Sequence, residues 1–512
     1  MTNAIWIGVD VGTTGVRAVA YQVDGTSLES ASALYPLNTP YPEWAEQDPF
    51  EVIAATEQVI QKVGALLTAQ GKKANGLSFS TVFHSFLAYD ENFKPITTLM
   101  TWGDNRSSSI VNEMKKTQDC LAIYQRTGCP LHPMYPMTKV AWLREKAPDI
   151  YQKIHYIGSI KDFVFKTLTG EWVVDRSVAS GSGLYNLETL SWDKELLEYL
   201  NISEKNMPPV VSTTYSQKIS KEAAKRLGLA EETKIVIGAG DGVLVNVGLG
   251  AVNPGQVSCT IGTSGAIRML SKKPKLDPKG RTWCYNLTDD VWVSGGAINN
   301  GGLCLRWVRE KFCEAEEQQA KENHLDVYDL MTKKAEKVTA GSEGLLLLPF
   351  FTGERAPNWN ADIRAMFFGL TLSHKKEHFI RATMEGVCYR MHSILKVLEE
   401  VMGDVNDIRV SGSFTHSKLW LQILADILNK PIGLSNIDEG AAFGAALLGF
   451  VSEGVLKDIS DTSHFIKINQ LYYPNAANRD VYDALYDIYD RIYWNLQKEF
   501  SDIAAFQKNT MK

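Results

Sequence analysis

The chain has 512 residues and a formal net charge of −6, and Lys, Arg, Asp and Glu together make up 22% of it. A chain of this length predicts two or three domains, each long enough to bury a sizeable core. Acidic and basic residues are mixed along the sequence, without the basic cluster that binds nucleic acid or a membrane surface. The composition therefore argues against nucleic-acid and membrane partners.

The start of the chain and the short length of its apolar stretches predict a soluble cytoplasmic protein. The sequence does not begin with a cationic segment followed by a cleavable apolar stretch, so a secretion signal is not expected. The longest apolar stretches, such as residues 345–351, are too short to span a bilayer. Seven cysteines are scattered without a CxxC pair, which predicts reduced, mostly buried thiols rather than disulfides or a zinc site.

The first half of the chain alternates short apolar strands with segments of helical periodicity. A strand is expected at 5–9 and another at 16–23, followed by a hairpin turn at Asp24-Gly25, so the start predicts a β-meander. The further elements expected here are strands at 76–80, 86–89 and 235–239, and helices at 50–69, 136–146 and 161–168.

A turn rich in glycine and hydroxyls, Asp10-Val11-Gly12-Thr13-Thr14, directly follows the first strand. Such a turn can point backbone N–H groups and hydroxyls at one spot, which suits an anion such as phosphate. The Asp10 carboxylate could hold Mg²⁺ through water, because magnesium keeps much of its hydration shell. The alternative is an Asx-type turn in which Asp10 only caps its own backbone.

Asp241 lies between two glycines, in Gly240-Asp241-Gly242, where the strand at 235–239 ends. The glycines allow the backbone to bend sharply and a ligand to come close. A carboxylate in such a place could orient an attacking hydroxyl and accept its proton during phosphoryl transfer. The alternative is an ordinary Asp-Gly surface turn, with the next helix beginning at Asn246.

A second turn of the same kind, Gly262-Thr263-Ser264-Gly265, follows another strand at 257–261. Both halves of the chain thus begin with a strand, a hydroxyl-rich turn and a second strand, which indicates a weak internal duplication. Two such turns could together hold a nucleotide triphosphate, and the domain boundary is expected near residues 252–255. The elements expected after the second turn are strands at 282–286, 291–295 and 408–412, and helices at 375–401 and 417–429.

A group of aromatic and polar residues in the first half could bind a polyhydroxylated ligand. Such a ligand needs paired donors and acceptors as well as an apolar platform. His84 follows Phe83 at a strand edge, and Trp102 and Arg106 lie in one short segment, Trp102-Gly103-Asp104-Asn105-Arg106. Taken singly, each of these residues is more readily explained by an ordinary structural role.

Three features of the second half are less specific. Gly301-Gly302 opens an apparent helix and Gly412-Ser413 ends the strand at 408–412, so either pair could admit a flat base or ribose, with close packing as the alternative. The polar turn Gly353–Pro357 has no role that its composition reveals. In the helical tail, a tyrosine stripe predicts packing on the second domain, with a subunit contact as the alternative: Tyr482, Tyr486, Tyr489 and Tyr493.

Together these segments resemble the FGGY carbohydrate kinases, over residues 4 to 455. The motifs are specific in this combination and order: Asp10–Thr14, Trp102–Arg106, Asp241-Gly242, Gly262–Gly265, Gly353–Pro357 and Ser411–Ser413. Within the family the resemblance is closest to the gluconate kinases of Gram-positive bacteria, through RTGCPLHPMYPMTKVAWL (126–143), TIGTSGAIR (260–268) and FTGERAPNWN (351–360).

The resemblance implies an α/β fold of two actin-like, ribonuclease H-like domains with a catalytic cleft between them. The N-terminal domain, 1–252, would bind the sugar, and the C-terminal domain, 253–455, would bind ATP. Residues 456–512 would form a helical extension packed on the second domain. The resemblance also implies ATP and Mg²⁺ as cofactors, and a homodimer is suggested by it alone.

The resemblance also gives roles to single residues by position. Asp241 matches the catalytic base of the family. The residues that match its phosphate and nucleotide motifs are Asp10, Gly12, Thr13, Thr14, Gly262, Thr263, Ser264, Gly302, Gly412 and Ser413. Ser413 stands where many relatives have glycine or alanine. Phe83, His84 and Trp102 fall at sugar contacts, and Arg106 is added to them as a hypothesis.

The expected reaction is ATP-dependent phosphorylation of D-gluconate to 6-phosphogluconate, with Asp241 as general base and Mg²⁺ near Asp10. A kinase for xylulose, ribulose or glycerol is the nearest alternative. A non-enzymatic ATP switch of the same fold and a sugar-binding pseudo-kinase are more distant ones, and intact Asp10 and Asp241 argue against the pseudo-kinase. The carboxylate of gluconate needs a cation or converging N–H donors, and the sequence alone does not identify that group.

Overall fold

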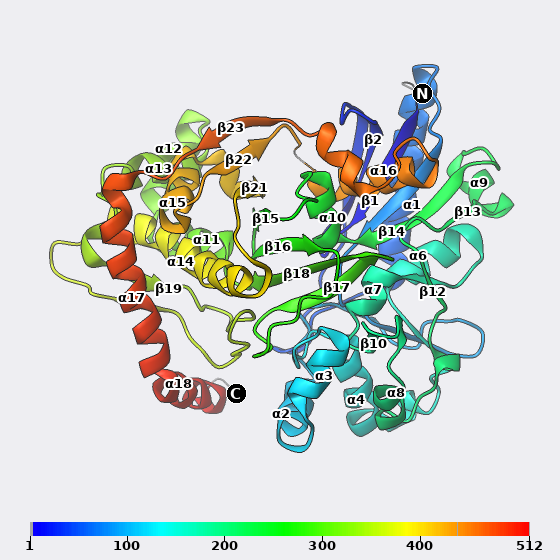
Figure 1. Ribbon diagram of the computed structural model, residues 1–512, viewed down its shortest axis with the longest axis horizontal. Coiled ribbons are helices and arrows are strands. Elements are labelled where there is room, and N and C mark those ends of the chain that lie inside the picture. The colour runs from blue at the N-terminus through cyan, green and yellow to red at the C-terminus, as the bar shows by residue number, and fades with distance from the viewer. Residues whose placement is uncertain (1–3, 438, 511–512) are drawn as a thin grey trace. The chain divides into compact units, whose positions relative to one another are not determined.

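The structure is a computed structural model that describes residues 4–437 and 439–510 (Figure 1). Contacts within the chain divide it into two compact units. The first unit comprises Met1–Pro254, Leu270–Ser294 and Glu439–Lys467, and the second comprises Gly255–Met269, Gly295–Asp438 and Ile468–Lys512. The linear boundaries expected after residues 252 and 455 stay predictions.

A six-stranded mixed sheet forms the centre of the first unit. Its spatial order is β13 (Ser216–Lys218), β14 (Lys234–Gly240), β5 (Gly76–Thr81), β1 (Ile5–Val11), β2 (Gly15–Gln22) and β3 (Ser27–Leu34). β1 pairs antiparallel with β2 and parallel with β5, and β5 pairs parallel with β14. The expected β-meander and the hairpin turn at Asp24-Gly25 are confirmed, because β2 and β3 pair antiparallel on either side of that turn.

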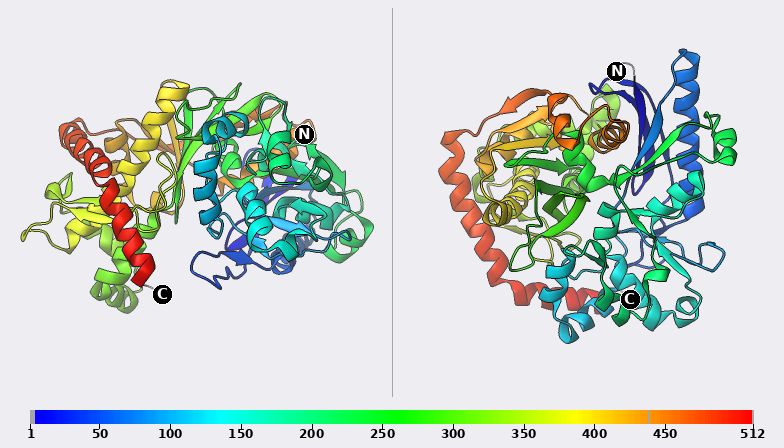
Figure 2. Two further views of the ribbon diagram at one scale, coloured as in Figure 1. Left: turned by 90° about the horizontal axis from the view of Figure 1, so that it is seen from below. Right: turned by 45° about the vertical axis from the view of Figure 1, so that its right-hand side comes forward.

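Helices cover both faces of this sheet, with α1 (Pro49–Ala69) on one face and α16 (Gly440–Ser452) on the other. Successive residues of a strand point to opposite faces. Ile7 and Val9 of β1 belong to the core that α1 covers. Figure 2 shows α1, in blue, lying along the first strands of the chain, β1 to β3. Gly8 faces α16, where a Cβ would come within 1.9 Å of the Ala442 carbonyl oxygen. Residues 439–467 therefore complete the core of the first unit.

Short strand pairs and further helices complete the first unit. The pairs are β4 (Glu46–Gln47) with β7 (Leu99–Met100), β6 (Leu87–Tyr89) with β8 (Tyr156–Gly158), β9 (Val174–Asp175) with β12 (Val210–Val211), and β10 (Tyr185–Asn186) with β11 (Ser191–Trp192). The helices are α2 (Ser108–Thr117), α3 (Cys120–Thr127), α4 (Pro136–Lys146), α5 (Pro148–Tyr151), α6 (Ile160–Thr169), α7 (Arg176–Ser180), α8 (Lys194–Tyr199), α9 (Lys221–Leu227) and α10 (Asp241–Gly248). The helices expected at 50–69, 136–146 and 161–168 are confirmed as α1, α4 and α6.

The second sheet of the chain repeats the pairing of the first. Its spatial order is β17 (Trp283–Thr288), β18 (Val291–Ile298), β16 (Gly265–Ser271), β15 (Gln256–Ile261), β21 (Asp407–Ser411), β22 (Ile432–Ser435) and β23 (Ile468–Tyr472). β15 pairs antiparallel with β16 and parallel with β21, just as β1 pairs with β2 and β5. The internal duplication predicted from the two strand–turn–strand segments is thus confirmed.

Helices also form most of the rest of the second unit. They are α11 (Gly302–Phe312), α12 (Glu314–Asn323), α13 (Val327–Ala335), α14 (Lys376–Met402), α15 (Lys418–Leu428), α17 (Arg479–Asn495) and α18 (Gln497–Thr510). The helices expected at 375–401 and 417–429 are confirmed as α14 and α15. The apolar run at 345–351 forms only a short strand, β19 (Leu346–Leu348), paired with β20 (Met366–Phe368). Pro349 follows directly and has no N–H to continue the ladder.

α17 packs on the second unit through its tyrosines. Tyr482, Tyr486, Tyr489 and Tyr493 are all buried in the hydrophobic core of that unit. The Tyr482 hydroxyl donates to Glu385 at 2.9 Å and accepts from Arg381 at 3.2 Å. Arg381 also donates to Glu385 at 2.8 Å, so a buried polar network joins α17 to α14.

The structure can be compared with the sequence on two further points, the state of the cysteines and the length of the apolar helices. All seven cysteines are free, six of them are buried and Cys120 is half-buried, as expected. Among the helices that the structure describes, none combines the length and the apolar character needed to cross a lipid bilayer.

We expect Tyr482→Phe to lower the free energy of unfolding by about 1–2 kcal/mol, because Glu385 and Arg381 lose a buried hydrogen-bonding partner. Urea denaturation of the variant and its parent measures the change. Tyr473→Phe is the matched control, since Tyr473 is 64% exposed, and its effect should stay within about 0.5 kcal/mol. An unchanged urea midpoint for Tyr482→Phe would contradict the importance of this network.

Candidate functional site

Asp10 stands at the end of β1, beside the parallel strand β5. The register pairs it with Ser80, whose hydroxyl donates a hydrogen bond of 2.6 Å to Oδ1 of Asp10. Burial raises the pKa of the Asp10 carboxyl to about 7, and repulsion from Asp241 and Glu439 adds to the rise. The hydrogen bond from Ser80 and the charge of Lys161 lower this pKa and offset the rise only in part. Negative charges are therefore crowded at this edge of the sheet.

The turn that follows β1 is held by polar contacts. The Gly12 N–H donates to the Gly15 carbonyl at 2.9 Å. The Tyr35 hydroxyl contacts the carbonyl oxygens of the same two glycines, at 2.7 and 3.0 Å. The indole N–H of Trp102 donates to Oγ1 of Thr13 at 3.0 Å. Trp102, predicted as a sugar contact, thus touches the predicted phosphate turn.

Asp241 is the first residue of α10, because β14 ends at Gly240. The expected helix start at Asn246 is therefore wrong. Oδ1 of Asp241 accepts the N–H of Gly242 at 2.6 Å, and the first turn of a helix suits a carboxylate through its free N–H groups and partial positive charge. The glycines on either side of Asp241 are typical of a turn, which is why the sequence predicts one here. The structure has a helix at this position, and it packs closely against α16: a Cβ on Gly248 would come within 1.8 Å of the Gly440 carbonyl oxygen.

Phe83 and His84 lie against the backbone that leads to Asp241. A Cβ on Gly240 would come within 2.3 Å of the Phe83 ring, so this ring packs directly on the glycine. The His84 backbone has a φ of 62°, a left-handed conformation that is uncommon for a non-glycine residue and recurs at functional sites. The structure thus brings two predicted sugar contacts to the end of β14.

Two tyrosines extend this aromatic group. Nδ1 of His84 lies 2.6 Å from the carbonyl oxygen of Gly181, which can only accept, so Nδ1 carries a proton. Nε2 of His84 lies 3.5 Å from the Tyr285 hydroxyl, which is 3.0 Å from the Tyr135 hydroxyl. Sequence reasoning missed both tyrosines. Tyr285 is 201 positions from His84, whereas Tyr135 lies inside the segment 126–143 that carried the family resemblance.

Arg106 is held by two carboxylates of the first unit. Its Nε and Nη2 donate to Asp104 at 2.8 and 2.7 Å, and Nη2 also donates to Glu46 at 2.5 Å. The guanidinium carbon lies 3.6 Å from the centre of the Trp44 ring, and only 3% of the side chain is exposed. These contacts give Arg106 a structural role, and its contact with a sugar stays a prediction.

Glycines allow three backbone segments to meet at the second turn. The Gly262 N–H donates to the Ser264 carbonyl at 2.9 Å, and the Gly302 N–H donates to the Gly262 carbonyl at 2.6 Å. A Cβ on Gly412 would come within 2.5 Å of the Ile261 carbonyl oxygen, and one on Gly302 within 2.9 Å of that of Gly262. Close backbone packing, left open as the alternative for these glycines, is therefore present at both positions.

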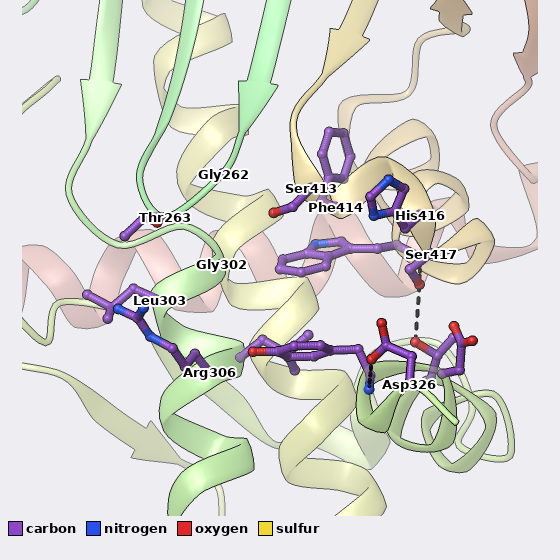
Figure 3. Close-up of a pocket in the computed structure, with 15 residues that line it drawn as sticks. Gly262, Thr263, Gly302, Leu303, Arg306, Asp326, Ser413, Phe414, His416 and Ser417 are labelled. Carbon is purple, nitrogen blue, oxygen red and sulfur yellow. Dashed lines mark hydrogen bonds between the residues drawn. The ribbon is translucent and has the colours of Figure 1, made fainter. Parts of the chain in front are cut away.

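A cavity of about 350 Å³ lies beside this turn within the second unit (Figure 3). Its volume is in the range of small-molecule sites. Of the nucleotide residues predicted in the second half of the chain, Gly262, Thr263, Gly302 and Ser413 line the cavity, whereas Ser264 and Gly412 do not. The lining residues are Gly262, Thr263, Gly302, Leu303, Leu305, Arg306, Asp326, Tyr328, Asp329, Thr332, Ser413, Phe414, His416, Ser417 and Trp420. Tyr328 and Trp420 give the cavity aromatic surface that suits a flat base.

Three helices begin at this cavity. α11 starts at Gly302, α13 follows its N-cap Asp326, and α15 follows its N-cap Ser417. Figure 3 shows these helix starts around the same space. Each helix N-terminus carries a partial positive charge, and Arg306 on α11 adds a full one. The Asp326 side chain caps α13 and the Ser417 side chain caps α15, and Asp326 and Asp329 bring negative charge to the lining. The positive groups of the cavity are therefore concentrated at α11, whose start has no side-chain cap.

The polar turn Gly353–Pro357 supports the segment that leads to Gly302. Oε1 of Glu354 accepts the N–H of Asn299 at 2.8 Å. The side-chain amide of Asn300 donates to the first carbonyl of the turn, also at 2.8 Å. This turn therefore holds the start of α11 beside the cavity, a role that its composition did not reveal.

Comparison with known sequences covers nearly the whole chain. Residues 5–248 match the family model for the N-terminal domain of the FGGY family of carbohydrate kinases, and residues 257–453 match the one for its C-terminal domain. The gluconokinase of Bacillus subtilis (strain 168) is 41% identical over 507 residues, which cover 98% of each chain.

Two solved structures are similar over nearly their full length. The gluconate kinase from Lactobacillus acidophilus superposes with a TM-score of 0.91 at 32% identity, covering 98% of this chain and 99% of that one. The ligand-bound xylulose kinase from Lactobacillus acidophilus has the same TM-score and identity, with coverages of 98% and 100%. The expected α/β fold with two actin-like domains is confirmed by this similarity.

We expect Asn300→Ala to weaken the affinity for ATP, the ligand that the family resemblance implies, by about tenfold. The side chain of Asn300 is fully buried, and losing hydrogen bonds worth about 1.4 kcal/mol changes a Kd tenfold. Isothermal titration calorimetry with ATP measures the change. Asn299→Ala is the matched control, since its backbone N–H still reaches Glu354, and its Kd should stay within about twofold. An equal loss of ATP affinity in the two variants would contradict the supporting role assigned to the Asn300 side chain.

Proposed function

This chain is a member of the FGGY family of carbohydrate kinases, and we propose that it transfers the γ-phosphoryl group of ATP to D-gluconate. The products are then 6-phosphogluconate and ADP. The observation that best supports this substrate is the 41% identity over 507 residues to the gluconokinase of Bacillus subtilis. In this proposal the first unit supplies the acidic edge at the ends of β1 and β14. The second unit supplies the cavity at the starts of α11, α13 and α15.

ATP is proposed to bind in the cavity of the second unit. Hydroxyls and backbone N–H groups of the turn Gly262-Thr263-Ser264 would bind phosphate oxygens, and the start of α11 together with Arg306 would favour the same negative charge. Gly302, Gly412 and Ser413 border the base and ribose in this proposal. Gly12, Thr13 and Thr14 form the corresponding phosphate turn of the first unit.

Asp241 is proposed as the general base. The O–H bond of the terminal hydroxyl of gluconate breaks as its oxygen forms a bond to the γ-phosphorus, and the bond from that phosphorus to ADP breaks. The proton passes to the Asp241 carboxylate. Because the transition state of phosphoryl transfer is loose, this proton leaves late. The main contribution of the carboxylate is then to orient the hydroxyl in line with the phosphoryl group.

Mg²⁺ is proposed to lie near Asp10 and to contact it through water. The residues fit a hydrated divalent cation, because Asp10 at the end of β1 and Asp241 directly after β14 lie at the same edge of the sheet, where both strands pair parallel with β5. A positive ion there would relieve the repulsion of Asp10 by Asp241 and Glu439, which adds to the rise of the Asp10 pKa. Among the described residues, no three His, Cys, Asp or Glu side chains form a metal site by themselves. Magnesium commonly keeps several waters and takes phosphate oxygens as ligands. When bound, it would neutralise charge on the transferred phosphoryl group.

Phe83, His84 and Trp102 are proposed to contact the sugar. Phe83 and His84 lie beside the approach to Asp241, and Trp102 donates to Thr13 in the phosphate turn. Phosphorylation of xylulose is the second candidate, supported by the equal similarity to the Lactobacillus acidophilus xylulose kinase. A homodimer and a cytoplasmic location stay predictions.

A panel of acceptors tests the substrate. Among D-gluconate, D-glucitol, D-xylulose, D-ribulose and glycerol, we expect gluconate to give the highest kcat/KM, by about a hundredfold or more. D-Glucitol is the matched control, because it keeps the hydroxyls of gluconate and replaces the carboxylate by CH₂OH. The hydroxyl of this analogue offers one neutral acceptor oxygen in place of two charged ones, so a donor that serves the second carboxylate oxygen would be left unpaired. A coupled assay of ADP release measures the rates. A higher kcat/KM for any of the four neutral acceptors than for gluconate would reject gluconate as the substrate, while the chain would remain a carbohydrate kinase.

Asp241→Asn should lower kcat by about 10²–10⁴-fold, the range for loss of a general base. The amide keeps the size of the side chain, so the Kd values for ATP and gluconate should remain near those of the parent. Steady-state kinetics and calorimetry measure the two effects. Asp24→Asn, in the exposed turn between β2 and β3, is the control and should keep the parent kcat. Near-normal turnover in Asp241→Asn would remove this residue from its assigned role.

A further inference from the structure

Lys161, on α6, is a buried cation to which the proposed reaction assigns no role. Its side chain is 1% exposed. The ammonium donates to three backbone carbonyl oxygens, those of Phe79 at 2.8 Å, Ile237 at 2.7 Å and Ala239 at 3.0 Å. An ammonium has three N–H donors, so each donor has one acceptor here. Two of the three acceptors belong to the last residues of β14, shortly before Asp241.

These carbonyl groups lie at an irregularity of the sheet. The parallel register between β14 and β5 shifts between Val236 and Ala239. Gly238 has a φ of 72°, and a Cβ there would come within 1.9 Å of the Phe79 carbonyl oxygen. Such a bulge interrupts the ladder, turns the strand and leaves backbone groups that need other partners. Lys161 supplies hydrogen-bond donors at this bulge.

A second contact holds the same backbone. The Gly240 N–H donates to Oγ of Ser177 at 2.8 Å, and this hydroxyl donates to Oδ1 of Asp175 at 2.5 Å. Oδ2 of Asp175 lies 3.9 Å from the Lys161 ammonium. Lys161, Ser177 and Asp175 therefore form one connected group around residues 237–240, and the next residue is Asp241.

The charged groups that act on Lys161 are acidic. Burial lowers the pKa of Lys161 to about 8, and Asp175, Asp10 and Asp241 oppose this shift. The three acceptors on β5 and β14 match the three donors of the charged form. The site is thus built for an ammonium group and not for a neutral amine.

We propose that Lys161 is a positioning residue, which fixes the bulge of β14 and thereby sets the direction of the Asp241 carboxylate. The inference rests on the proposed role of Asp241 as general base. Lys161 is not assigned a contact with either substrate. Its loss should therefore slow the chemical step more than it weakens the binding of ATP or gluconate.

Lys161→Met tests the inference, since methionine keeps an unbranched side chain and removes both the donors and the charge. We expect kcat to fall by about a hundredfold, the effect of a small misplacement of a catalytic group. The KM for gluconate and the Kd for ATP should stay within about threefold, because the binding residues are unchanged. Steady-state kinetics, calorimetry and a thermal melt of the full chain provide these values.

Lys139→Met is the matched control, because Lys139 is also fully buried and also donates to backbone carbonyls, those of His84 and Thr101. Its expected effect is a raised KM for gluconate through His84, with a smaller change in kcat. Similar losses of kcat in both variants, in proportion to their losses of thermal stability, would overturn the inference. Loss of turnover in Asp241→Asn together with normal kcat in Lys161→Met would overturn it while leaving the proposed function standing.

Ser177→Ala gives a second test that does not depend on the folding of Lys161→Met. This variant removes only the hydroxyl that accepts the Gly240 N–H and leaves the ammonium in place. We expect kcat to fall by about tenfold, with KM and Kd within about twofold of the parent. An unchanged kcat in a folded Ser177→Ala variant would show that clamping residues 237–240 does not matter for turnover, and would overturn the inference.

Discussion

Parallel pairing of three strands is the constraint on which the first part of the site depends. β5 lies between β1 and β14 and pairs parallel with both, so the carboxyl ends of all three strands meet at one edge of the sheet. This edge carries Asp10, Ser80 and Asp241, and Phe83 and His84 follow β5 directly. Acidic and aromatic residues that are distant in sequence therefore lie at the same edge of the sheet.

The second sheet repeats this pairing without its negative charge. Thr260 and Ser411 are aligned across β15 and β21, as Asp10 and Ser80 are across β1 and β5, and their hydroxyl oxygens lie 3.0 Å apart. Thr260 has a hydroxyl where Asp10 has a carboxylate. The residues at this position of the second sheet therefore do not repel a phosphate group. The duplicated frame has thus diverged into an edge that carries carboxylates in the first unit and one that carries hydroxyls at the aligned positions of the second sheet.

Buried cations of the first unit act mainly on the backbone and on structural carboxylates. Lys161 holds the bulge of β14, Lys139 donates to the carbonyls of His84 and Thr101, and Arg106 is enclosed by Asp104 and Glu46. Groups held in this way are oriented before substrates arrive, which lowers the reorganisation that catalysis would otherwise require. The backbone that leads to Asp241 and the backbone at His84 are therefore both hydrogen-bonded to buried lysines.

The amino-acid sequence by itself determined the strand–turn–strand segments, the glycine and hydroxyl turns and the candidate carboxylates, because periodicity and turn chemistry are local properties. It predicted Asp10 and Asp241 as candidate functional residues and the family to which the chain belongs. Only the tertiary structure decided that α10 begins at Asp241, that Tyr285 joins His84, and that three helices start at one cavity. These features depend on contacts between distant segments, such as the close packing of Gly248 against α16, and such contacts leave no local pattern in the sequence.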